Sequence, residues 1–97
     1  MKRIYLSGPM KALNFYSSFK TEADRLRGLG YEVVNPAEEP VYAGYRESTR
    51  KDLKALLDCD TLALLDGWEQ SSRALFEMNV AHHVGMDIVI AKEVGHG

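Results

Sequence analysis

Apolar positions along the chain fall into two patterns, short continuous runs and longer stretches with helical spacing. The short runs are rich in β-branched or aliphatic residues and predict strands. They occupy residues 3–7, 31–34, 61–65 and 87–91. The longer stretches carry apolar residues three or four positions apart and predict helices. They occupy residues 13–29, about 46–58 and about 71–84.

Outside these elements the composition is that of turns and loops. Residues 36–45 include two prolines and a glycine and predict a loop, and the last six residues predict a frayed end. Thr49, with Asp52 three positions on, resembles a capping pair near the start of the second helix. The apolar stripe of that helix is expected at Leu53, Leu56 and Leu57.

The regular alternation of strand and helix predicts an α/β fold. Short connections favour a parallel sheet with helices on both faces and right-handed crossovers. We expect one three-layer domain of Rossmann or flavodoxin type over residues 1–97, with a four-stranded sheet in the order 2-1-3-4. Ligands of such sheets bind outside the carboxyl ends of the strands, so candidate chemistry is expected there.

Composition excludes some classes of function. The 97 residues hold 12 Lys+Arg against 14 Asp+Glu, a net charge of -2, which excludes a whole-surface basic footprint for duplex nucleic acid. No apolar run approaches the ~18 residues that span a bilayer. Because the first residues enter a predicted strand directly, we expect no signal sequence. A single cysteine, Cys59, excludes an internal disulfide and fits a reducing compartment. We therefore expect a cytoplasmic protein.

Several common ligand motifs are missing. Neither G-x-G-x-x-G nor a Walker lysine loop follows the first predicted strand, which argues against a dinucleotide fold or a P-loop. That strand ends in Ser7, Gly8 and Pro9 instead of the acidic cluster of a phospho-receiver domain. His82 and His83 point about 100° apart on a helix and lack a carboxylate at metal-ligand spacing. No metal and no organic cofactor is expected.

The third predicted helix carries a glutamate within its apolar face. Taking about 100° per residue, Glu77 falls between Val84 and Ala81, whereas Phe76 falls on the polar side. A carboxylate on the inward side is costly unless it is paired or reaches a cleft. Glu77 therefore either faces the ligand crevice or extends along the helix flank to solvent.

Two further residues near the strand ends could complete a site. Asp66 follows the third strand, where it is either a turn residue or a second carboxylate. Tyr5, on the first strand, is either a core residue or a hydroxyl that reaches the crevice. Two carboxyl groups and a tyrosine around one crevice suit cleavage at an anomeric carbon.

Polar and aromatic residues near the start of the third helix have two interpretations each. Ser71, with Arg73 close behind, is either an ordinary N-cap or part of a phosphate or carboxylate site. Trp68, in a turn that we expect to be exposed, and Phe76 could stack on a base or be covered by another subunit.

Four segments, taken together and in order, form a fairly specific combination. They are Ile4 to Pro9, Gly30 to Pro36, Asp58 to Trp68, and Glu77 followed by Ala81. Over nearly the whole chain they resemble the nucleoside 2-deoxyribosyltransferase-like superfamily. The likeness is nearest to a short branch that is common in bacteriophages and prophages, so a bacterial or phage-infected cell is the implied setting.

The resemblance implies a role for each matched residue. Glu77 matches the family's catalytic glutamate, which attacks or stabilises the anomeric carbon. Tyr5 matches the tyrosine that orients it, and Asp66 matches the aspartate that contacts the departing base. Ser71 stands where related nucleotide N-hydrolases have a phosphate-contacting serine, and Arg73 agrees with this. The other implied substrate contacts are Ser7, Gly8, Pro9, Asn35, Gly67 and Trp68.

The implied activity is N-glycosidic-bond cleavage, by hydrolysis or deoxyribosyl transfer. The implied substrate is a nucleotide or nucleoside, with a 2′-deoxyribonucleoside 5′-monophosphate favoured. Asn79 stands where the family commonly has glycine, and no clear equivalent of the transferases' C-terminal tail is present. These departures favour hydrolysis, or nucleotide binding or sequestration without turnover, over transfer. An open crevice and Phe76 on a polar face predict a homodimer or higher homo-oligomer.

Overall fold

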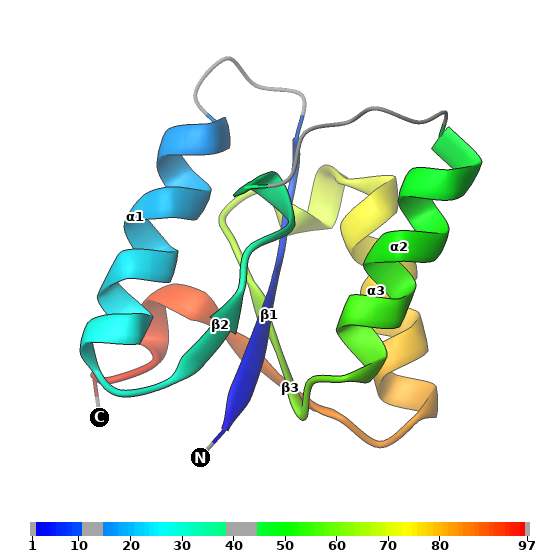
Figure 1. The fold of residues 1–97 in the computed structure, drawn as a ribbon. Coiled ribbons are helices and arrows are strands. Elements are labelled where there is room, and N and C mark those ends of the chain that lie inside the picture. The colour runs from blue at the N-terminus through cyan, green and yellow to red at the C-terminus, as the bar shows by residue number, and fades with distance from the viewer. Residues whose placement is uncertain (1, 11–14, 39–44, 97) are drawn as a thin grey trace.

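The described parts of the chain form a parallel sheet flanked by helices. The computed structural model describes residues 2–10, 15–38 and 45–96, which contain four strands and three α-helices. The strands are β1 (Arg3–Ser7), β2 (Glu32–Val34), β3 (Thr61–Leu64) and β4 (Asp87–Ile90), and the sheet order is β2-β1-β3-β4 (Figure 1). The helices are α1 (Phe15–Gly28), α2 (Tyr45–Leu57) and α3 (Ser72–His83). The predicted fold class and strand order are confirmed.

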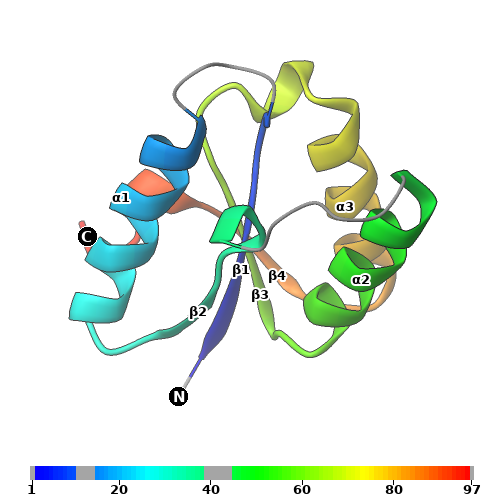
Figure 2. The same ribbon diagram turned by 45° about the horizontal axis from the view of Figure 1, so that its top comes forward.

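The helices cover both faces of the sheet. Helix α1 lies on one face, and α2 and α3 lie side by side on the other (Figures 1 and 2). Successive residues of a strand point to opposite faces, so Ile4 and Leu6 of β1 join the core under α1, whereas Tyr5 joins the core under α2 and α3. This alternation sends Tyr5 and Ser7 toward the same helices.

The ends of β1 and β3 approach closely at Gly8. The Leu65 N–H donates to the Ser7 carbonyl over 2.8 Å. A Cβ atom added to Gly8 would lie 2.8 Å from the Leu65 Cβ, closer than real Cβ contacts. Beyond β3, Gly67 has φ +88° and faces Pro9. At this edge of the sheet, Gly8 is therefore needed for space and Gly67 for its backbone conformation.

The second helix begins at Tyr45, one residue before its predicted start, but two details of its sequence interpretation are wrong. Because α2 begins at Tyr45, Thr49 lies inside it and the capping pair with Asp52 is wrong. Leu56 is fully buried, but Leu57 is 55% exposed, so the predicted apolar stripe is wrong at that position. The loop predicted at residues 36–45 starts with a 3-10 turn at Pro36–Glu38, and residues 39–44 lie outside the described residues.

The predicted frayed end is wrong for residues 92–96. Ala91–Glu93 forms a 3-10 turn, and Ala91 is buried against the core under α1. Arg25, in the last turn of α1, donates from its two terminal nitrogens to the carbonyls of Ala91 and Val94, over 2.7 Å each. This guanidinium satisfies backbone groups that a free end would leave to water, so the end of the chain is docked.

No helix in the described ranges combines the length and the apolar character that crossing a bilayer requires.

Candidate active site around Glu77

A buried carboxylate on α3 is held by two hydroxyl groups from β1. Glu77 is 3% exposed. The Tyr5 hydroxyl donates to Glu77 Oε2 over 2.7 Å, and the Ser7 hydroxyl donates to Glu77 Oε1 over 2.7 Å. Both donors are buried as well. The inward direction that the helical pattern gave Glu77 is confirmed, and the carboxylate is held at both oxygens.

Local sequence explains why these groups meet. Residues two apart in a strand share a face, which aims Tyr5 and Ser7 together at the layer of α2 and α3. Ser71 is the N-cap of α3, and its Oγ accepts from the Ala74 N–H over 3.1 Å; the phosphate alternative stays a prediction. Six residues after the cap, Glu77 comes round to the buried side of the helix, next to β1.

Burial and hydrogen bonding have opposite effects on the acidity of this site. Burial raises the pKa of Glu77, while the hydrogen bonds from Tyr5 and Ser7 and the charge of Arg73 lower it, and the net pKa is above the ordinary value. Burial and the nearby Glu77 charge raise the pKa of Tyr5 far above its usual range. Tyr5 therefore stays protonated and acts toward the carboxylate as a donor.

An arginine lies between Glu77 and a second acidic residue. The Arg73 guanidinium donates from Nη2 to Asp52 of α2, and its Nε lies 3.9 Å from Glu77 Oε2. A hollow of about 20 Å³ opens here, room for one water molecule. Its lining residues are Thr49, Asp52, Leu53, Arg73, Phe76 and Glu77. The guanidinium that the sequence assigned to phosphate is thus engaged with Asp52.

Asp52 is the member of this cluster that sequence reasoning missed. Its position three residues after Thr49 suggested a cap, and no local pattern links it to α3. The available signal was weak: Asp52 lies directly before Leu53 and four positions before Leu56, on the flank of the apolar stripe.

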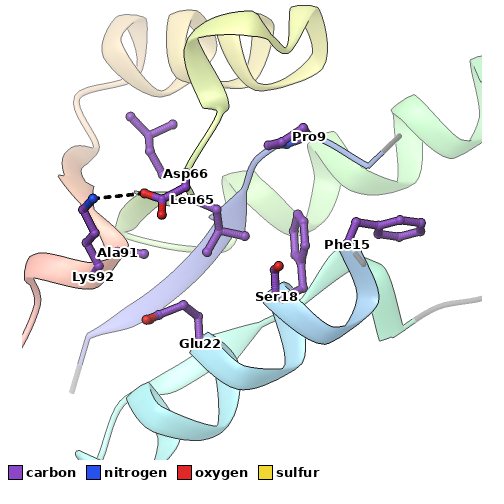
Figure 3. Close-up of a pocket in the computed structure, with 10 residues that line it drawn as sticks. Pro9, Phe15, Ser18, Glu22, Leu65, Asp66, Ala91 and Lys92 are labelled. Atoms are coloured by element: carbon purple, nitrogen blue, oxygen red, sulfur yellow. Dashed lines mark ion pairs between the residues drawn. The ribbon is translucent and has the colours of Figure 1, made fainter. Parts of the chain in front are cut away.

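Asp66 lies in a different hollow, on the side of the sheet that carries α1 (Figure 3). Its side chain is 81% exposed and forms an ion pair with Lys92, Nζ to Oδ1, over 3.2 Å. The hollow has a volume of about 390 Å³. Phe15, Phe19 and Leu65 supply apolar lining, and Pro9 lies at its rim. The structure therefore gives Glu77 and Asp66 separate surroundings.

One known family model matches most of the chain. Residues 2–90 match the family described as a domain of unknown function, DUF4406. The chain belongs to the DUF4406 family. No curated protein matches it. Since the description of DUF4406 specifies no activity, the functional argument for this DUF4406 chain depends on its site.

The structure of this DUF4406 chain also places the other residues that the resemblance implied as substrate contacts. Gly8 and Pro9 directly follow β1, and Gly67 lies in the turn after β3, where it faces Pro9. Asn35 is buried, and its Oδ1 accepts from the Ala37 N–H over 3.0 Å. Trp68 is half-buried against the core under α2 and α3, so the expectation of an exposed turn residue is wrong.

The DUF4406 site offers carboxylate chemistry. Among residues 2–10, 15–38 and 45–96, no three His, Cys, Asp or Glu side chains are grouped so that they could hold a metal ion. The Glu77 carboxylate is instead desolvated and oriented, next to the sheet edge where α/β proteins bind ligands. Such a group can attack, or stabilise by charge, an electron-poor carbon.

Proposed function

We propose that this protein cleaves the N-glycosidic bond of a nucleotide or nucleoside, with a 2′-deoxyribonucleoside 5′-monophosphate as the preferred substrate. The observation that carries the proposal is the Glu77 carboxylate, buried and held by the Tyr5 and Ser7 hydroxyls over 2.7 Å each. Burial of a charge is costly, and a purely structural role would be served as well by an apolar residue. The resemblance described above supplies the bond type.

The proposed reaction has two steps. A Glu77 oxygen attacks the anomeric carbon, or stabilises it as an oxocarbenium-like centre, while the bond to the base nitrogen breaks. The electron pair of that bond leaves with the base, and a proton from water neutralises it while Asp66 contacts the departing base. Water then adds to the anomeric carbon and loses its proton, which frees the sugar and restores the carboxylate. Tyr5 and Ser7 hold Glu77 in one orientation throughout.

Binding of this substrate would span the strand ends. Asp66 is proposed to contact the base, and its hollow on the α1 side is large enough for a planar ring with apolar faces. The sugar would cross the edge of the sheet near Gly8 and Gly67, between the Asp66 hollow and Glu77. Because Arg73 is engaged with Asp52, we assign the phosphate to Ser71 and the N-terminal end of α3.

Nucleotide binding without turnover is the second candidate. It is favoured by the low exposure of Glu77 and by the separate hollow around Asp66 and Lys92. A protein that only sequesters a nucleotide needs such a hollow and does not need the chemistry of Glu77. In both cases we propose action in the cytoplasm of a bacterial or phage-infected cell.

The buried Cys59 thiol, whose pKa is raised to about 11 by burial, is unreactive in either case.

A nucleotide panel separates the two candidates. We expect incubation with deoxynucleosides and their 5′-monophosphates, followed by chromatography, to yield free base, faster from the monophosphates. A thermal shift with intact ligand would instead support the binding candidate. If no compound of the panel gave free base or a thermal shift, both candidates would be contradicted.

We also propose that a second copy of this chain packs on α3. Phe76 on that helix is 47% exposed and Val84, its C-cap, is 53% exposed, and exposed apolar patches often mark an interface. We expect light scattering at micromolar concentration to give a dimer or larger assembly, and Phe76→Glu to shift it toward the monomer. A wild-type monomer with full activity would contradict this.

A further inference from the structure

Two charged residues next to Glu77 occupy positions that local helix physics disfavours. Arg73 lies in the first turn of α3, where the helix dipole repels a cation. Its order with Glu77, arginine four residues before glutamate, is the weaker arrangement of an i,i+4 pair. Asp52 lies inside α2, where aspartate is a poor helix former. Because local preference does not explain them, tertiary contacts must account for these residues.

The tertiary contacts place the guanidinium off-centre between two carboxylates. Arg73 bonds to Asp52, while its nearest approach to Glu77 is 3.9 Å, from Nε to Oε2. That distance is too long for a hydrogen bond but short enough for strong charge attraction in a site that is mostly buried. The side chains of Arg73 and Asp52 are 29% and 15% exposed, so water screens the three charges only in part.

We infer that Asp52 restrains Arg73, so that the guanidinium stabilises the Glu77 carboxylate from a distance without forming a direct ion pair with it. The inference deepens the proposed function and rests on it for the role of Glu77 as the attacking or stabilising group. A carboxylate in a bidentate pair with arginine has both oxygens engaged and much of its charge offset. With the guanidinium held by Asp52, each Glu77 oxygen accepts one hydroxyl hydrogen bond and keeps its other lone pair available. Asp52 and Arg73 are thus positioning residues.

Because Arg73 and Asp52 carry opposite charges, removing one or the other should shift the Glu77 pKa in opposite directions. Strand β1 contributes Tyr5 and Ser7, helix α3 contributes Arg73, and helix α2 contributes Asp52. The charge of Arg73 lowers the pKa of Glu77, and the charge of Asp52 raises it. Arg73→Met should therefore raise the Glu77 pKa. Asp52→Asn removes the opposing charge and releases the guanidinium toward Glu77, so it should lower that pKa.

The experiment is a titration of Glu77 in the whole protein, followed by carbon-13 NMR of labelled glutamate side chains. The Glu77 resonance is assigned by its loss in Glu77→Gln. We expect opposite displacements of its titration midpoint, upward in Arg73→Met and downward in Asp52→Asn. Asp24→Asn is the matched control, because it breaks the exposed Lys20–Asp24 pair on α1 and should leave the midpoint unchanged. Arg73→Lys, which keeps a charge, should lie between wild type and Arg73→Met.

Kinetics on the same variants test the positioning role. We expect Asp52→Asn to lower kcat about tenfold or more with KM nearly unchanged, since the carboxylate stays ionised but becomes paired. The acid limb of its pH profile should move to lower pH. Asp52→Glu should recover part of kcat.

Two results would overturn the inference. One is a Glu77 midpoint that is the same in all variants or moves in the same direction in both. The other is an Asp52→Asn enzyme with wild-type kcat. If Arg73→Met or Asp52→Asn prevents folding, Arg73→Gln and Asp52→Ser provide the same comparisons, because they also remove the charge. Failure of the proposed function is recognised separately, because a wild-type protein that releases no base still gives the NMR titration.

Discussion

Glu77→Gln is expected to abolish base release and, near neutral pH, to raise the melting temperature. The substitution keeps the size of the side chain but removes the charge that would attack or stabilise the anomeric carbon, so we expect kcat to fall about 10³-fold or more. It also removes the cost of burying that charge. A gain of about 1 kcal/mol would raise Tm by about 4–8 °C for a domain of this size.

The pH dependence of this stability gain follows from the direction of the Glu77 pKa. Because burial raises that pKa above the ordinary 4.5, the folded protein binds the proton more readily than the unfolded chain does. The contribution of Glu77 to stability is therefore fully present at acid pH and is lost as pH rises through the raised pKa. The advantage of Glu77→Gln should be present at neutral pH and disappear below about pH 4.

The measurement pairs chromatography of released base with thermal melts at several pH values. Glu69→Gln is the matched control, because Glu69 is an exposed glutamate in the turn before α3 and its replacement should change neither property. Unchanged base release in Glu77→Gln would contradict the proposed role of the carboxylate. A lower neutral-pH Tm would show that burial of its charge is not the dominant cost.

Gly8→Ala is expected to destabilise the fold and to damage the site together. The added Cβ would lie 2.8 Å from the Leu65 Cβ, and no flexible side-chain end is available there to move away. The ends of β1 and β3 must separate, which we expect to cost about 1–3 kcal/mol. Ser7, directly before Gly8, donates to Glu77, so the same displacement should reduce base release even in the fraction that is folded.

Gly28→Ala is the control for this substitution. A Cβ added to Gly28, at the end of α1, meets nothing within 4 Å, and alanine is a better helix former than glycine. Urea unfolding should show a lower midpoint for Gly8→Ala and an equal or higher one for Gly28→Ala. Equal midpoints for Gly8→Ala and wild type would contradict the close approach of the strand ends.

Much of the fold could be predicted because its signals are local and periodic. The apolar run at β3 indicated a central strand, and strand and helix alternation indicated the parallel sheet. The start of α2 was also predicted to within one residue, but its cap was not, because Thr49 lies four residues after Tyr45, inside the helix. The docked end of the chain was missed because Arg25 binds the carbonyls of Ala91 and Val94 from 66 and 69 residues away.

The candidate site, like the fold, has features that local sequence predicts and others that depend on tertiary packing. The helical period alone placed Glu77 inward, because burial of one face follows from position in the repeat. The sequence by itself also determined that Tyr5 and Ser7 share a face of β1. Only the tertiary structure decided that Asp52 of α2 holds Arg73 of α3. Ion pairs between separate helices depend on how the helices pack, and no spacing along the chain encodes that packing.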